Sequence, residues 1–357
     1  MSQQSLPRIV HIFGQTPHHY VHMRKFLLDA MFESGIDQVF WAWALPGCKQ
    51  SYEGFEYYEN GRALLTWMET QRQSVRFVFH GMFERQIWPY LTFSSVTARS
   101  SWVCWGAELY QHAEKGPTFK RKLMNLCHRV ACKRMLDIFP LNAGDGKLIG
   151  DYIGARPSEP LPYPLIGVDV QSKQKKDQTL RILVGNSAAP SNEHDWIFQS
   201  LSKHANQDIE LIVPLNYAGS EEYVAEVIKR GHELFADKFR PITSMLGKHE
   251  YDELLAKVDC AVFGHIRQQG LYVVYTMLKH GKKMYVRGAT STFTSMSSLG
   301  FHLYDSDELS TLTFEQFLSF DKEKLRINQQ LMEETYSEQA LIGKWRQRML
   351  ALFQQYP

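Results

Sequence analysis

The sequence predicts an α/β protein made of two doubly wound, Rossmann-like domains that face one another across a cleft. Two observations support this fold class. The chain has 357 residues, about twice the usual length of one domain. Short apolar runs alternate with helical patterns in both halves, which is typical of βαβ units with parallel strands. Ligands of such domains bind at the carboxyl ends of the strands, so functional residues are expected at those ends.

Each predicted strand is a short apolar or aromatic run that ends near Gly, Pro or a polar residue. In the first half these runs are 8–13, 38–42, 76–80 and 101–105. In the second half they are 181–184, 210–213, 241–244, 260–263 and 283–286, with helical patterns at 192–204, 221–235, 248–258 and 271–280.

A proline-rich stretch at 154–164 and a polar, charged stretch at 167–179 are predicted to connect the halves. We therefore expect an N-terminal domain at 1–170 and a C-terminal domain at 178–335. Residues 336–357 have one apolar stripe, and we expect a terminal helix there that packs back on the N-terminal domain.

Composition excludes several classes of protein. Hydrophobic residues make up 44% and charged residues 22% of the chain, unlike a mainly disordered protein. The formal charge of +2 gives no global reason to expect a nucleic-acid partner. Five scattered cysteines without a C-x-x-C pair suit a reduced, cytosolic protein. No secretion signal and no apolar run of about 18 residues is found, so we expect a soluble or peripheral membrane protein.

Two loops of the second half are candidate phosphate sites. One follows the strand 181–184, and the other precedes the apolar helix predicted at 271–280, whose N-terminus favours an anion. The chain has neither a P-loop nor a G-x-G-x-x-G motif, and an ordinary strand-to-helix turn explains the first loop equally well. The candidate diphosphate residues are Gly185, Asn186, Ser187, Asn192, Glu193 and His194 in the first loop, and Arg267, Gln268, Gln269 and Gly270 in the second.

Possible proton-transfer groups follow three predicted strands of the first half. His18 and His80 follow the first and third strands, and Glu108 follows the fourth. A structural role is the commoner explanation for any one of these residues, but together they indicate a functional edge. No H-x-x-x-H, H-E-x-x-H or D-x-D element organises them, so we expect no catalytic metal and no cofactor.

Residues 115–134 contain seven Lys or Arg residues and no acid. Phe119, Leu123, Leu126, Cys127, Val130 and Ala131 lie on one helical face of this segment. A core helix with a solvated basic back is the first interpretation. A surface that meets anionic lipid head groups is the second.

These motifs together resemble one family. They are P-H-H after the first strand, H-G-x-F-x-x-x-x-W at 80–88, W-G-A-E-L-Y at 105–110, L-V-G-N-S…S-N-E-H at 183–194 and R-Q-Q-G at 267–270. The chain resembles the TDP-N-acetylfucosamine:lipid II N-acetylfucosaminyltransferases, glycosyltransferase family fifty-six. At position 108 the resemblance implies Asp, whereas this chain has Glu.

The resemblance implies a GT-B-like fold, a dTDP-4-acetamido-4,6-dideoxygalactose donor and an undecaprenyl-diphosphate-linked acceptor at the inner face of the bacterial plasma membrane. The nucleoside would lie against Pro214, Asn216, Tyr217 and Leu246, and the acceptor or membrane against His19, Trp105, Lys120, Arg121, Lys122 and Arg129. An inverting reaction needs a base, whereas a retaining one can use the leaving phosphate. A nucleotide-sugar epimerase or hydrolase, and a non-catalytic saccharide-binding module, remain as alternatives.

Overall fold

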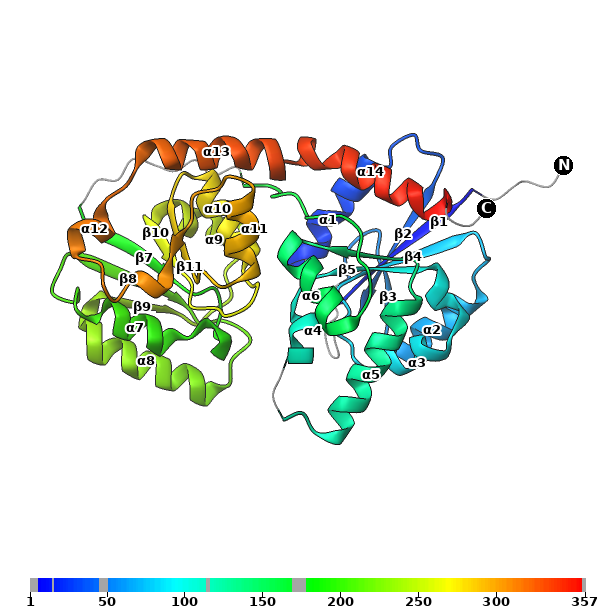
Figure 1. The fold of residues 1–357 in the computed structure, drawn as a ribbon, viewed down its shortest axis with the longest axis horizontal. Helices are drawn as coiled ribbons and strands as arrows, with labels where there is room; N and C mark the ends of the chain where they lie inside the picture. The colour runs from blue at the N-terminus through cyan, green and yellow to red at the C-terminus, as the bar shows by residue number, and fades with distance from the viewer. Residues whose placement is uncertain (1–5, 15, 45–50, 114–115, 169–177, 355–357) are drawn as a thin grey trace. The chain divides into compact units, whose positions relative to one another are not determined.

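The structure is a computed structural model that describes residues 6–14, 16–44, 51–113, 116–168 and 178–354 (Figure 1). The chain divides into two compact units. The first comprises Met1–Ile166 together with Glu338–Pro357, and the second comprises Gly167–Ser337. The sequence analysis placed the corresponding division at 170–178 and separated residues 336–357 as a terminal helix. In the structure Glu338–Pro357 belongs to the first unit, and the two residues before it belong to the second.

The first unit is built on a six-stranded parallel sheet in the order β3-β2-β1-β4-β5-β6. Phe13, the last residue of β1, pairs with Ala42 of β2 and His80 of β4, and His80 pairs with Val103 of β5. The carboxyl ends of the central strands therefore lie level at one edge. The strands are β1 (Arg8–Phe13), β2 (Asp37–Trp43), β3 (Glu56–Tyr58), β4 (Val75–His80), β5 (Ser100–Cys104) and β6 (Asp137–Pro140).

Helices cover both faces of this sheet. The side chains of α2 (Gly61–Thr70), α3 (Ile87–Phe93), α5 (Phe119–Arg134) and α6 (Ala143–Ile153) share one core with Val10, Phe77 and Trp102. The short helix α4 (Ala107–Tyr110) follows β5. On the other face, α1 (Pro17–Ala30) packs against α14 (Glu338–Gln354). Trp345 of α14 is fully buried there, stacks on His80 and donates a 2.9 Å hydrogen bond to the Pro162 carbonyl.

The second unit has a six-stranded parallel sheet in the order β12-β11-β10-β7-β8-β9. Figure 1 shows α7 and α8 on one side of it and α9, α10 and α13 on the other. Its strands are β7 (Leu180–Val184), β8 (Ile209–Pro214), β9 (Phe239–Ile242), β10 (Cys260–Val262), β11 (Lys283–Val286) and β12 (Tyr304–Asp305). Its helices are α7 (His194–Ser202), α8 (Glu221–Phe235), α9 (Lys248–Lys257), α10 (Leu271–Lys279), α11 (Ser291–Ser298), α12 (Phe314–Leu318) and α13 (Lys322–Tyr336).

Most predicted elements agree with the structure within one or two residues, and three differences remain. The short strands β3, β6 and β12 were not predicted. The strand predicted at 241–244 is β9, at Phe239–Ile242. Helix α7 begins at His194 rather than at 192, because Glu193 has a left-handed backbone with φ 55° and the Asn192 side chain binds back into the preceding loop.

The first interpretation of residues 115–134, a core helix, is confirmed for Ala131, which lies in the core, but is wrong for the exposed part of its apolar face. Phe119, Leu123 and Leu126 are 83%, 52% and 54% exposed, whereas Asn125, His128, Ala131 and Cys132 are the buried residues of α5. The helix is thus rotated by roughly half a turn from the expected orientation. Its core side contains the His128 ring, which stacks on Trp88 at 4.2 Å.

Within the described residues, no helix is both long and apolar enough to cross a bilayer.

Replacement of Trp345 by Ala is expected to destabilise the first unit by about 3–5 kcal/mol, because a fully buried ring and its hydrogen bond to Pro162 are removed together. Urea unfolding followed by circular dichroism measures the change. Lys344→Ala, on the exposed side of the same helix, is the matched control and should change stability by less than about 0.5 kcal/mol. An equal effect of both substitutions would contradict the packing described for α14.

Candidate functional site

In the second unit one buried side chain, Asn192, shapes the loop that follows β7. Its Oδ1 accepts hydrogen bonds from the Asn186 backbone N–H at 2.9 Å and from His265 Nε2 at 2.7 Å. Its Nδ2 donates to the carbonyls of Ser187 and Ala189, at 2.9 and 3.0 Å. Asn192 is fully buried, and its amide is occupied by the loop itself. Its role in this structure is therefore to hold the loop rather than to meet a ligand.

The close approach of Asn192 explains the glycine at position 185. Gly185 has φ 66°, and a Cβ atom there would lie 2.6 Å from Asn192 Oδ1. A larger residue would be strained in this backbone conformation and would also push the Asn192 side chain away. The shape of the loop after β7 thus requires both Gly185 and Asn192.

A second set of hydrogen bonds joins this loop to the loop before α10. Ser191 Oγ donates to Gln269 Oε1 at 2.7 Å, and Gln269 Nε2 donates to Asn186 Oδ1 at 3.1 Å. Asn186 Nδ2 in turn donates to the Tyr217 hydroxyl at 3.0 Å. Two segments about 75 residues apart in sequence therefore form one polar surface at the N-terminus of α10. We call these two joined loops, 185–194 and 264–270, the double loop.

The electrostatics of the double loop favour an anion. Burial lowers the pKa of His194 to about 4 and that of His265 to about 3, with Arg267 contributing to the second shift, so both rings are neutral at pH 7. The guanidinium of Arg267, which reaches Ser191 Oγ at 3.4 Å, provides positive charge. Gly270 caps α10 with φ 67°, and the helix is buried from Val273 to Leu278. A buried helix that points its N-terminus at a polar surface adds a favourable field for negative charge.

The proposed nucleoside residues lie at the same edge of the second unit's sheet. Pro214 ends β8, and the Leu215 N–H donates to the Ile242 carbonyl of β9 at 2.7 Å, so the loops after these two strands are neighbours. Asn216 Nδ2 lies 3.4 Å from the Ser244 carbonyl. Tyr217 is 46% exposed, and Leu246 is half-buried. Of the double-loop candidates, Gln268 is buried and Glu193 is exposed.

In the first unit, His80 belongs to a buried chain of hydrogen bonds. Trp105 Nε1 donates to the Tyr163 hydroxyl at 3.1 Å, and this hydroxyl lies 2.5 Å from His80 Nδ1. His80 Nε2 lies 2.9 Å from His11 Nδ1. His11 Nε2 lies 3.0 Å from Gln38 Oε1, whose amide N–H₂ donates to the Leu27 carbonyl.

Only one arrangement of protons satisfies the whole chain with neutral groups. Because Gln38 Oε1 accepts, His11 carries its proton on Nε2 and accepts from His80 at Nδ1; His80 then accepts from Tyr163 at Nδ1. Burial lowers the pKa of His11 to about 4 and that of His80 well below its ordinary value, which agrees with neutral rings. Both nitrogens of His80 are engaged and its ring is fully buried, so the ring positions Tyr163 and Trp105 in this structure.

Glu108 is 3% exposed and joins the loops after β4 and β5. Its Oε1 accepts from the Trp105 backbone N–H at 2.9 Å and from Trp102 Nε1 at 3.0 Å. Burial raises the pKa of this carboxyl, and the backbone amides of Trp105 and Met82 oppose the shift. This geometry fits a positioning role for Glu108, with its longer side chain reaching Trp102.

The structure brings forward a carboxyl group that the sequence analysis did not single out, Glu84. It lies in the loop after β4 and is 9% exposed. A Cβ atom at Gly14 would be 2.8 Å from Glu84 Oε1, so the carboxyl lies directly against the end of β1. Burial, together with the charge of Glu108, raises the pKa of Glu84 to about 7. A carboxyl group that titrates near neutral pH is suited to proton transfer.

The motif H-G-x-F-x-x-x-x-W provides the geometry that holds Glu84. Gly81 has φ 79°, its N–H donates to the Val103 carbonyl at 3.0 Å, and a Cβ atom there would lie 2.6 Å from the Phe83 ring. Trp88 Nε1 donates to the Met82 carbonyl at 3.1 Å. The sequence analysis used this motif to select His80 as a candidate. The same spacing also fixes the position of the residue after Phe83, which is Glu84, and the motif could therefore have indicated Glu84 as well.

The remaining first-unit candidates lie in two places. His19 meets Trp105 edge to face at 5.3 Å, and Phe83 meets the same indole at 5.6 Å, so an aromatic edge surrounds the strand ends. The His18 side chain lies outside the described part of the structure. Lys120, Lys122 and Arg129 are exposed on α5, and Arg121 is half-buried. Among the described residues, no group of three or more His, Cys, Asp or Glu side chains is placed to hold a metal ion.

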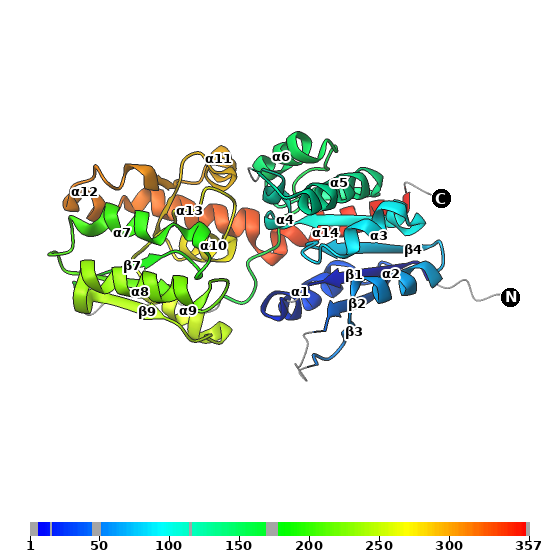
Figure 2. The same cartoon turned by 90° about the horizontal axis from the view of Figure 1, so that it is seen from below.

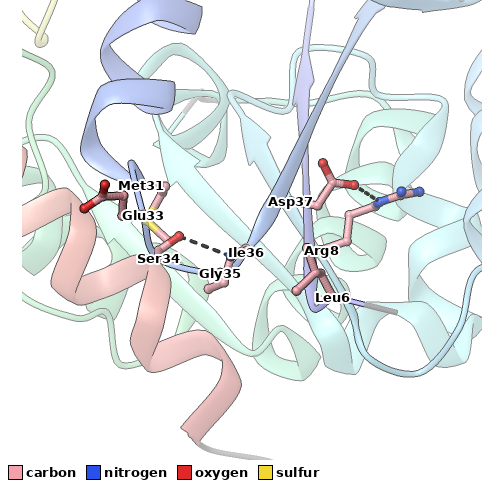
Figure 3. A pocket seen from close by; sticks show the side chains of 8 residues that line it. All are labelled: Leu6, Arg8, Met31, Glu33, Ser34, Gly35, Ile36 and Asp37. Carbon is pink, nitrogen blue, oxygen red and sulfur yellow. Dashed lines mark hydrogen bonds and ion pairs between the residues drawn. The ribbon is translucent and has the colours of Figure 1, made fainter. Parts of the chain in front are cut away.

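A shallow pocket elsewhere in the first unit is unrelated to these residues. It lies at the amino ends of β1 and β2, beside the turn after α1, and the 2.6 Å ion pair between Arg8 and Asp37 lines it (Figure 3). The candidate residues lie at the carboxyl ends of the same strands.

Solved structures identify the fold as GT-B, the two-domain fold of many glycosyltransferases. A sucrose-phosphate synthase from Thermosynechococcus elongatus matches with a TM-score of 0.74 and 9% identity, covering 98% of this chain and 100% of that one. Anabaena HepE, solved in complex with UDP and glucose, matches with a TM-score of 0.72 and 10% identity over 96% of this chain and 99% of that one. An α,α-trehalose-phosphate synthase from Burkholderia vietnamiensis has a TM-score of 0.67 and 8% identity over 98% of this chain and 100% of that one.

A family model described as 4-alpha-L-fucosyltransferase, glycosyl transferase group 56, matches residues 6–339. The chain belongs to glycosyltransferase group 56. The match extends over both units, so the transferase fold and the family agree along nearly the whole chain.

Replacement of Glu84 by Gln is expected to stabilise the protein at alkaline pH. Because the folded-state pKa is raised to about 7, ionisation of Glu84 costs stability progressively between its ordinary pKa of 4.5 and pH 7. At pH 8 the variant should therefore be more stable by on the order of 3 kcal/mol, and at pH 4.5 by less than about 0.5 kcal/mol. Denaturant unfolding at the two pH values measures the difference. Glu59→Gln, at an exposed glutamate of the same unit, should show no such pH dependence.

Proposed function

We propose that the protein transfers 4-acetamido-4,6-dideoxy-D-galactose, or a close dideoxy amino sugar, from a dTDP donor to an undecaprenyl-diphosphate-linked saccharide. The reaction would belong to bacterial surface-polysaccharide synthesis of the enterobacterial common antigen type, at the cytoplasmic face of the inner membrane. The family description supports a 6-deoxygalactose, because L-fucose is 6-deoxy-L-galactose; the sugar proposed here belongs to the D series. The single observation on which the donor site rests is the double loop at the N-terminus of α10.

The donor diphosphate is proposed to lie against the double loop. Sugar transfer leaves a nucleoside diphosphate whose negative charge increases as the glycosidic bond breaks, and preorganised donors that face this charge lower the barrier. Arg267, the backbone around Gly270 and the amide of Gln269 are suitable donors. Asn192 and His265 hold these groups in place from beneath. This arrangement supports a reaction in which protein groups, rather than a divalent metal, stabilise the leaving group.

The acceptor is proposed to bind at the strand ends of the first unit. The rings of His19, Phe83 and Trp105 offer apolar faces and edges for a sugar, and Glu84 is held beside them by the loop after β4. In an inverting reaction the Glu84 carboxylate would accept the proton of the attacking hydroxyl. In a retaining reaction the leaving phosphate would accept it, and Glu84 would orient the hydroxyl. The configuration of the product distinguishes these two roles.

The two alternatives make different demands. A nucleotide-sugar epimerase or hydrolase would consume the donor without any lipid-linked acceptor, so a product assay that lacks acceptor separates it from a transferase. A saccharide-binding module would bind sugar without preferring dTDP and would not need Arg267. Membership in a glycosyltransferase family favours the transferase.

Purified protein should bind dTDP more tightly than UDP, GDP or ADP, and EDTA should leave the affinity unchanged. Arg267→Ala and Gln269→Ala are expected to weaken dTDP binding at least tenfold, because each removes a donor or a hydrogen bond of the double loop. Isothermal titration calorimetry measures the affinity. Arg326→Ala, which removes an exposed arginine of α13, is the control. Wild-type affinity in Arg267→Ala and Gln269→Ala would exclude the double loop as the diphosphate site.

Glu84→Gln is expected to lower kcat/KM for transfer by about 10²–10⁴-fold if the carboxylate accepts the hydroxyl proton. The rate of the wild-type enzyme should rise with pH through about 7, the pKa of Glu84, because the ionised form is the base. The variant should lack this rise while keeping its affinity for dTDP. A pH profile that is the same in both proteins would assign the proton to another acceptor.

A further inference from the structure

We infer that the outer face formed by α3 and α5 is a docking surface for anionic lipid, with aromatic and aliphatic side chains that enter the head-group region. We call this the α3/α5 face. It consists of the exposed residues Phe93 on α3 and Phe119, Lys120, Lys122, Leu123, Leu126, Arg129 and Lys133 on α5. The inference rests on the proposed function in one respect, that the acceptor is lipid-linked.

The apolar part of the face is a continuous stripe along the helix. Phe119, Leu123 and Leu126 follow the spacing i, i+4, i+7, which places them on one side of α5. They are 83%, 52% and 54% exposed, and Phe93 is 85% exposed. Isolated exposed apolar residues are ordinary, but four large ones on two adjacent helices need a partner.

The backbone that carries the stripe is held in place because hydrogen bonds join α3 and α5. Thr92 Oγ1 donates to the Cys127 carbonyl at 3.0 Å. Arg134, in the last turn of α5, donates to the carbonyls of Thr92 and Ser94 at the end of α3. The two helices lie side by side in both views (Figures 1 and 2). The exposed side chains are thus presented on a packed helix pair.

Positive charge flanks the apolar stripe on both sides. In a helical projection Lys122, Arg129 and Lys133 lie on one side of the stripe and Lys120 on the other, and all four are exposed. From Arg85 to Arg134 the sequence has two acidic residues, Glu108 and Glu114. Glu108 is buried at the strand ends, and Glu114 lies outside the described residues. The described part of this segment therefore shows no exposed carboxylate that would repel an anion.

An anionic bilayer fits this pattern better than a second copy of the chain. A helix with an apolar stripe between lysines and arginines places the stripe at the acyl boundary and the cations among lipid phosphates. A symmetric contact between two copies would instead bring the same positive charges together, which is unfavourable. Phe119, in the first turn of the helix, is one of the residue types found on the apolar face of helices that lie at a membrane surface.

Flotation with vesicles tests the inference without donor or acceptor. The wild-type protein is expected to bind vesicles of phosphatidylcholine that contain about 30 mol% phosphatidylglycerol, because the anionic lipid gives the vesicle surface a negative potential. It should bind pure phosphatidylcholine much less, and high salt should weaken binding. Phe119→Ser/Leu123→Ser/Leu126→Ser should lower the partition coefficient at least tenfold. Lys120→Gln/Lys122→Gln/Arg129→Gln should lower it by roughly 100-fold, about fivefold for each charge.

Matched controls replace exposed residues elsewhere. Phe32→Ser removes a phenylalanine that is 68% exposed at the end of α1, and Lys229→Gln/Lys322→Gln/Lys324→Gln removes three exposed lysines of the second unit. Both should bind like the wild type. If the triple serine variant does not fold, as judged by its thermal transition, Phe93→Ser tests the same face with one substitution and should lower binding at least twofold.

Failure of the wild type to bind anionic vesicles, or equal binding by the wild type and both α5 variants, would overturn the inference. Equal binding to neutral and anionic vesicles would overturn it as well, since the cations would then contribute nothing. A dimer in sedimentation equilibrium that the triple serine variant abolishes would assign the face to a second copy. These outcomes are independent of dTDP binding, so they leave the donor site of the proposed function unaffected.

Discussion

Both candidate sites depend on one constraint, the need to pair the polar side chains that are buried beneath them. In the second unit the fully buried Asn192 pairs its amide with the loop after β7 and with His265. In the first unit the chain from Gln38 through His11 and His80 to Tyr163 does the same beneath the strand ends. An unpaired amide or imidazole in these positions would cost about 1–3 kcal/mol each. The loops are therefore fixed from beneath, and their outward groups are left for ligands.

The same constraint gives different roles to two neighbouring carboxyl groups, Glu108 and Glu84. Glu108 is surrounded by N–H donors from Trp102, Trp105 and the backbone, so its charge is used to join two loops. Glu84 is also buried and experiences the charge of Glu108, and its pKa is about 7. One carboxylate that shapes a site and a second that titrates near neutrality is a common division of labour in enzymes. The motif around His80 thus supports Glu84 as much as it supports the histidine.

The sequence predicted the parallel βαβ organisation and the two loops of the second unit, because buried strands and strand-to-helix turns leave strong local patterns. It did not predict how Asn192 is used. A capping role and a loop-holding role need the same residue at nearly the same position, and the left-handed Glu193 decides between them. It also misplaced the apolar face of α5, since helical periodicity shows that one face is apolar but not which neighbour covers it. The His112–His128 pair, 2.8 Å apart, occupies the inner side instead.

The α3/α5 face is connected along the chain to the loop that contains Glu84. The loop that holds Glu84 leads directly into α3, which begins at Ile87 and ends at the exposed Phe93. Seven helical residues rise by about 10 Å, which is the length of α3 between the loop that holds Glu84 and the exposed Phe93. A lipid-linked saccharide held in a bilayer at the α3/α5 face could therefore extend its head group to Glu84 and the Trp105 edge while its hydrocarbon chain stays in the membrane. The same helix would then connect membrane contact with acceptor position.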